Sequence, residues 1–129
     1  MEFPISNDGI RAALDALLAE ADTLGVTRAT AHRLAVIVDE YCSNLIRHDN
    51  SVGPESMFEL ALSVESDGVT VMIEEKAGTF DPTTHRQSEP RDIGGQGIVL
   101  MRGLATALDY RSTNGSNRFR ATIKETDKT

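Results

Sequence analysis

The chain has 129 residues, of which 40% are hydrophobic and 26% are charged, and its formal net charge is −7. This length suits one domain with a single core, and the composition is that of a globular protein rather than a disordered or fibrous one. The negative charge argues against general nucleic-acid binding, because phosphate backbones attract clustered Lys and Arg. We expect one domain over residues 1–125 and a disordered tail at 126–129.

The cysteine and histidine content gives no sign of a disulfide or a zinc site. The single cysteine, Cys42, cannot form a disulfide within the chain, and its apolar helical setting favours a buried thiol over a catalytic nucleophile. The three histidines lack zinc-site spacing with it. The sequence has no secretory signal pattern and no apolar run of membrane-spanning length, so we expect a soluble cytoplasmic protein without a membrane partner.

Hydrophobic periodicity predicts a short strand and two helices in the first half of the chain. Residues 2–5 form the strand, which Pro4 limits to a sheet edge. A first helix follows the capping residues at 6–8 and ends at Gly25. A second helix begins at Thr27 or Thr30 and runs to about residue 48. Its apolar stripe consists of Ala31, Leu34, Ala35, Val38, Cys42, Leu45 and Ile46.

The second half of the chain predicts two hairpins separated by a loop and a helix. Alternating segments at 58–64 and 69–73 join at a turn over 66–68. Residues 81–97 contain two prolines and three glycines, and a loop of this length in a small domain is usually functional. A third helix over 98 to about 107 precedes strands at 108–113 and 118–123. Helices on one face of a mostly antiparallel sheet would bury these stripes, which is a two-layer α+β sandwich.

Glu40 and Asn44 form the first candidate site, on the second predicted helix. They are four residues apart, so they lie on the same side, at the border of the apolar stripe. Asn44 offers an uncharged oxygen ligand to Mg²⁺, and Glu40 is a general base if desolvation raises its pKa. His48 lies one turn further on and either lines the same cleft or caps the helix. On spacing alone, an incidental polar pair on a solvated helix face is the simpler interpretation.

Glu75 is the second candidate, at the end of the first predicted hairpin. Strand alternation places it on the same inward face as Val71 and Ile73. A carboxylate on such a face is costly unless a donor binds it. The sequence leaves two alternatives open: an adenine amino group is the donor, or the strand frays and Glu75 reaches water.

A glycine-rich segment is the third candidate. Gly94, Gly95, Gln96 and Gly97 lead into an apolar helix that begins at Ile98. Exposed backbone amides at a helix start favour phosphate. No Gly-Lys-Ser/Thr follows, so the segment is not a P-loop, and glycines also serve ordinary turns and hinges.

The order of these motifs resembles that of the bacterial anti-sigma factor serine/threonine kinases, small members of the GHKL superfamily. Residues 38–48 are similar to the N box of that family, 73–82 to its adenine box, 94–101 to its glycine box and 109–117 to its closing hairpin. The resemblance covers nearly the whole chain. It implies the GHKL (Bergerat) ATP-binding fold, a mixed sheet with helices on one face.

The resemblance also implies roles for individual residues and partners. Glu40 would be the general base, Asn44 the Mg²⁺ ligand, and residues 81–93 an ATP lid. The implied ATP-binding residues are Asn44, His48, Glu75, Ala77, Gly78, Phe80, Gly94, Gly95, Gln96, Gly97 and Ile98. Family members commonly form homodimers, sequester a sigma factor and phosphorylate a serine on a small antagonist protein, so we expect the same of this chain.

The adenine box departs from the family pattern of Asp-x-Gly before Phe-Asp-Pro. Alignment on Phe80 puts Glu75 at the Asp and Ala77 at the Gly. Both changes add bulk, and over-packing costs about 1–3 kcal/mol, or roughly tenfold to a hundredfold in affinity, unless Gly78 compensates. The alternative function is therefore a module with impaired nucleotide binding that acts only through protein–protein contacts. The ATP-binding half of a two-component histidine kinase is less expected, because no dimerising phospho-acceptor helix pair precedes the domain and the lid is short.

Overall fold

The computed structural model describes residues 1–48, 55–66, 68–75, 101–113 and 116–124. The elements, in chain order, are β1 (Glu2–Pro4), α1 (Asn7–Thr23), α2 (Arg28–His48), β2 (Met57–Glu65), β3 (Gly68–Glu75), β4 (Ala107–Thr113) and β5 (Ser116–Ile123). The predicted tail at 126–129 and the predicted lid at 81–93 lie outside the described residues, as does the predicted glycine box apart from its last residue, Met101.

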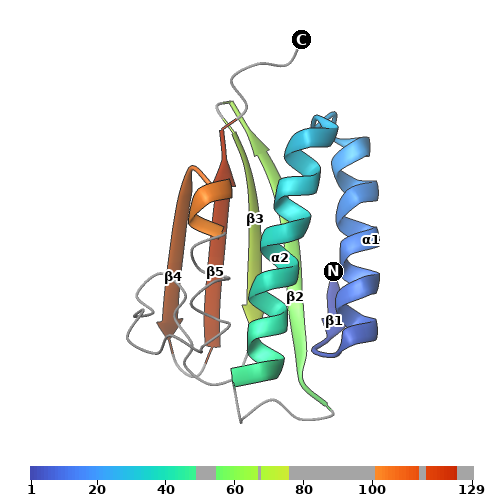
Figure 1. The fold of residues 1–129 in the computed structure, drawn as a ribbon, viewed down its shortest axis with the longest axis vertical. Helices are drawn as coiled ribbons and strands as arrows, with labels where there is room; N and C mark the ends of the chain where they lie inside the picture. The colour runs from blue at the N-terminus through green and yellow to red at the C-terminus, as the bar shows by residue number, and fades with distance from the viewer. Residues whose placement is uncertain (49–54, 67, 76–100, 114–115, 125–129) are drawn as a thin grey trace.

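The strands form one sheet in the order β1-β2-β3-β5-β4, and each described pairing is antiparallel. The two long helices pack side by side and cover one face of the sheet (Figure 1). Burial alternates along β3 and β5, as expected when only one face of a sheet carries the core. The predicted α+β fold class is confirmed.

Helix α1 begins and ends where the sequence predicts. The backbone amide of Gly9 donates to Ser6 Oγ at 3.0 Å, so Ser6 is the N-cap. Gly25 has a φ angle of 79°, a left-handed conformation that glycine adopts without strain and that ends the helix. The amide of Thr30 donates to Thr27 Oγ1 at 3.3 Å, which makes Thr27 the capping residue of α2. None of the described helices is long and apolar enough to cross a membrane.

The buried face of α2 is wider than the predicted stripe. Ile37 and Tyr41 were not predicted to be inside, yet both are fully buried. Helix α2 packs against both α1 and the sheet, and Tyr41 faces the sheet, where its ring stacks on Phe119. Ile46, which was predicted to be inside, is 38% exposed at the end of the helix. Val64, near the hairpin end of β2, is 42% exposed.

The last helix is shorter than predicted. Its described residues end at Leu104, whereas the sequence predicted an end near residue 107. The amide of Thr106 donates to the carbonyl of Thr122 at 2.7 Å, and Ala107 is already the first residue of β4. Strand β5 likewise begins at Ser116, two residues before the predicted start. In both places cross-strand pairing prevails over local helix and turn preference.

Candidate functional site

The candidate site lies at the end of the molecule where three elements meet. The C-terminal end of α2, the end of β3 and the beginning of β5 all lie at this end of the sheet (Figure 1). Glu40 and Asn44 come from α2, Glu75 from β3 and Asn117 from β5. The structure thus brings together two of the three segments that the sequence singled out.

Asn44 is more deeply buried than its sequence position suggested. Its side chain has no exposed surface, whereas the side chain of Glu40 is 27% exposed. Arg47 Nη2 donates to Asn44 Oδ1 at 2.7 Å and lies 4.0 Å from Glu40 Oε2. Asn44 Nδ2 is buried and has no hydrogen-bond partner within the described part of the chain. A buried amide donor in this state is uncommon in folded proteins and suits an atom that a ligand completes.

Glu75 is an internal carboxylate held by two side chains. Its side chain is only 2% exposed. The hydroxyl of Tyr41 donates to Glu75 Oε2 at 2.7 Å, and Asn117 Nδ2 donates to Glu75 Oε1 at 2.7 Å. The strand therefore does not fray at Glu75, and donors from the protein satisfy both carboxylate oxygens.

The phenol of Tyr41 is a fixed, neutral donor. Its ring stacks on Phe119 with a centroid distance of 4.3 Å and an interplanar angle of 12°. Burial, together with the negative charge of Glu75, raises the pKa of Tyr41 far above its usual value, so the phenol keeps its proton. Burial similarly raises the pKa of the Cys42 thiol, which agrees with the expectation of a buried thiol rather than a nucleophile.

Three residues of this arrangement were not singled out by their own patterns. Tyr41 lies three residues before Asn44, so helical spacing alone places it on the same side of α2. Asn117 is the direct cross-strand partner of Glu75, which sequence parity reveals only once the β3–β5 register is known. Arg47 lies three residues after Asn44, and its contact with Asn44 depends on side-chain geometry that the sequence does not give.

The remaining predicted site residues lie outside the part of the chain that the structure describes. These are Ala77, Gly78, Phe80, Gly94, Gly95, Gln96, Gly97 and Ile98, together with the side chain of His48.

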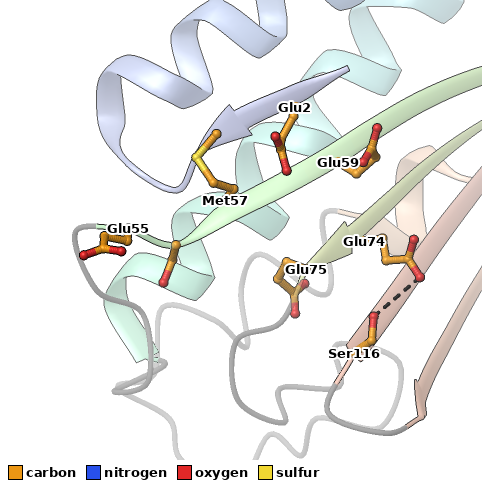
Figure 2. A pocket seen from close by; sticks show the side chains of 8 residues that line it. Glu2, Glu55, Met57, Glu59, Glu74, Glu75 and Ser116 are labelled. Atoms are coloured by element: carbon orange, nitrogen blue, oxygen red, sulfur yellow. Dashed lines mark hydrogen bonds between the residues drawn. The ribbon is translucent and has the colours of Figure 1, made fainter.

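A hollow of about 450 Å³ opens beside the ends of β1, β2 and β3, and Glu75 is part of its lining. Figure 2 shows its lining, which includes five glutamates. Ser116 Oγ donates to Glu74 Oε2 at 3.5 Å within it. So many carboxylates repel a triphosphate, and neither Glu40 nor Asn44 lines the hollow. We therefore place the metal and phosphate end of the candidate site at α2 and not in this hollow, whose lining shares Glu75 with the site.

The family model of the histidine kinase-like ATPase domain matches residues 3–123. The chain belongs to this family. Membership implies nucleotide binding, and the described part of the GHKL-like fold agrees with it.

Individual relatives agree with the family. The chain is 27% identical over 95 residues to the serine/threonine-protein kinase BtrW of Bordetella bronchiseptica. This alignment covers 69% of this chain and 67% of BtrW. Its fold is similar to a chain of the SiaB–SiaC complex from Pseudomonas aeruginosa, with a TM-score of 0.63 at 15% identity, over 95% of this chain and 88% of that one. It is also similar to the histidine kinase domain of the blue-light-activated kinase EL346 of Erythrobacter litoralis, with a TM-score of 0.56 at 18% identity, over 88% of this chain and 60% of that one. The family and the likeness to BtrW support a kinase-type activity, and the two solved structures agree in fold.

The described residues fit a magnesium–nucleotide complex at one end of the site better than at the other. At α2, Asn44 and Glu40 supply the oxygen donors that hard cations prefer, next to the unpaired Asn44 amide. At β3, the carboxylate in the position expected to bind adenine already accepts a bond from the protein at each oxygen.

Proposed function

We propose that this protein binds ATP with Mg²⁺, phosphorylates a serine on a small antagonist protein and sequesters a sigma factor. The observation that carries the proposal is the geometry of Asn44. It is fully buried, its Nδ2 has no partner among the described residues, and it lies one turn from the partly exposed Glu40. A purely structural asparagine would have both ends of its amide satisfied.

In this proposal Glu40, Asn44 and Arg47, all on α2, have separate roles. Bound ATP supplies the γ-phosphoryl group, and Mg²⁺ neutralises charge on its phosphate oxygens. Glu40 accepts the proton of the serine hydroxyl, for which its partial exposure leaves access. Asn44 Oδ1 would hold the metal, for which the guanidinium of Arg47 would have to leave this oxygen. The Arg47 side chain is 36% exposed, so it has room to move toward solvent.

The other residues of the proposed ATP site come from the sequence. Residues 94–98, at the start of the glycine box, would contact the phosphates through their backbone amides. His48, Ala77, Gly78 and Phe80 complete the lining in this proposal, and residues 81–93 form the lid.

The partners are proposed from the relatives. BtrW is a serine/threonine-protein kinase, and the SiaB–SiaC structure is a complex of two proteins. Both support a kinase that works on a protein partner. The homodimer rests on the family resemblance alone, and sedimentation of the purified protein tests it. The cytoplasmic location is the expectation from the sequence and stays part of the proposal.

The hydrogen bonds from Tyr41 and Asn117 to Glu75 favour a second candidate function. If these donors exclude the adenine base of ATP entirely, the chain acts as a protein-binding module without productive nucleotide binding. The two candidates differ in whether Mg-ATP stabilises the folded protein, since a ligand that binds only the native state must do so.

Phosphorylation in vitro tests the role of Glu40. Purified protein, radiolabelled ATP, Mg²⁺ and a small antagonist protein with an acceptor serine should yield a labelled serine. The Glu40→Gln variant should label roughly a hundredfold to ten-thousandfold more slowly, which is the usual contribution of a general base. Glu20→Gln, at an exposed position on α1, is the matched control and should keep the full rate. Equal rates for Glu40→Gln and Glu20→Gln would remove the proposed role of Glu40.

A further inference from the structure

The carboxylate of Glu75 is satisfied without any ligand. Each of its oxygens accepts one short hydrogen bond, from Tyr41 at 2.7 Å and from Asn117 at 2.7 Å. Only 2% of Glu75 is exposed. Its buried side chain, at the end of β3, therefore connects α2, β3 and β5.

The two donors are held in place. Tyr41 has no exposed surface and stacks on Phe119. Asn117 is 1% exposed and lies directly opposite Glu75 in the β3–β5 register. If either donor moved away, a buried charge would lose a partner, which is strongly unfavourable. Because only 2% of Glu75 is exposed and its two donors cannot easily withdraw, little of the carboxylate is left accessible to a nucleotide base.

Base selectivity depends on such a competition. A site rejects an analogue that lacks a hydrogen-bonding group because its own buried polar group is then left unpaired. In a site whose carboxylate waits for the adenine 6-amino group, replacing that group with an oxygen leaves the carboxylate unpaired and facing another acceptor. Here Glu75 keeps both protein donors whichever purine binds.

We propose that Tyr41 and Asn117 commit Glu75 to a structural role, so that the site discriminates little at position 6 of the purine. The triphosphate end and the α2 residues then provide most of the affinity, and inosine triphosphate binds about as well as ATP. This inference rests on the proposed function, because it requires that the protein bind a nucleotide.

The first test compares ATP with inosine triphosphate by calorimetric titration of the full chain in the presence of Mg²⁺. The two nucleotides differ only in the 6-amino group and the adjacent ring proton. We expect dissociation constants within about threefold of each other, which is well below the discrimination of a site built around that group. A preference for ATP of roughly thirtyfold or more would overturn the inference while leaving the proposed function intact. Failure of both nucleotides to bind would overturn the proposed function, and the inference with it.

The second test releases Glu75 from one donor. In Tyr41→Phe the ring can still stack on Phe119, but Glu75 Oε2 loses its hydrogen bond. The 6-amino group of ATP can then satisfy this oxygen, whereas inosine triphosphate cannot. We expect a preference for ATP of about tenfold to appear in this variant, corresponding to one charge-assisted hydrogen bond.

Tyr110→Phe is the matched control, because it removes a phenol hydroxyl from the neighbouring strand β4 without touching the Tyr41–Glu75 bond. It should keep the wild-type ratio of the two dissociation constants. Near-ultraviolet circular dichroism establishes that each variant is folded before titration. A folded Tyr41→Phe chain that still shows no preference would contradict the assignment of Tyr41 as the residue that withholds Glu75 from the base.

Discussion

At the scale of single residues, the most informative contact is that between Arg47 and Asn44. The guanidinium occupies the amide oxygen that would ligate a metal and also approaches Glu40. Because Arg and Mg²⁺ are both cations that bind oxygen, they would compete for Asn44 Oδ1 in the proposed site. The proposal therefore ties the metal dependence of nucleotide binding to one exposed side chain, that of Arg47.

Replacing Arg47 with methionine should increase the effect of Mg²⁺ on nucleotide affinity. The variant keeps the aliphatic part of the side chain and frees Asn44 Oδ1. The ratio of ATP dissociation constants without and with Mg²⁺ should rise by about threefold to tenfold, the range expected when a competing charged hydrogen bond is removed. Titration calorimetry with EDTA and with Mg²⁺ measures this ratio. Arg33→Met, at an exposed position on the same helix, should leave it unchanged; a ratio that stays constant in Arg47→Met would show that the guanidinium does not compete.

At the scale of elements, α2 carries both the proposed chemistry and much of the core. Its buried face includes two titratable groups, Tyr41 and Cys42, whose pKa values burial raises. In the unfolded chain these groups ionise near their ordinary pKa values, about 10 and about 8.5. The folded chain holds their protons to higher pH, so their contribution to stability is complete at neutral pH and is lost as the pH rises past the unfolded-state values.

This linkage predicts an alkaline loss of stability that depends on Cys42. The free energy of unfolding, from denaturant titrations between about pH 7 and about pH 11, should begin to fall near the unfolded pKa of the thiol. In Cys42→Ala the onset should move up toward about pH 10, where only Tyr41 responds. Each chain is compared with its own stability at neutral pH, because the smaller side chain lowers stability at every pH. The same onset in both chains would contradict the burial of the thiol.

Local sequence predicts where the first two helices begin but not where the last helix ends. The caps of α1 and α2, the first hairpin and the order of elements were predictable, because each depends on neighbouring residues such as Ser6, Gly25 and Thr27. The end of the last helix at Leu104 was not, since it depends on contacts with distant residues. The amide of Lys124, just after β5, donates to Thr106 Oγ1 eighteen residues earlier in the chain.

At the scale of the whole molecule, the candidate site depends on contacts between distant segments. Glu75 meets Tyr41 across 34 residues and Asn117 across 42. Sequence alternation correctly predicted an inward carboxylate at Glu75, but it could not say which donor satisfies the charge, because that depends on how α2 lies on the sheet. The Glu40–Asn44 face was predictable from helical spacing, whereas the full burial of Asn44 was not.

The central claim is that this end of the molecule binds a nucleotide with its metal. Thermal unfolding of the full chain with increasing Mg-ATP tests it most directly. We predict a saturable rise in the melting temperature, equivalent to about 2.7 kcal/mol when the ligand is at a hundred times its dissociation constant. The rise should be lost in Asn44→Ala and kept in Asn7→Ala, an exposed asparagine on α1. A wild-type melting temperature that does not change at millimolar Mg-ATP would contradict the claim and leave the protein-binding module as the function of this fold.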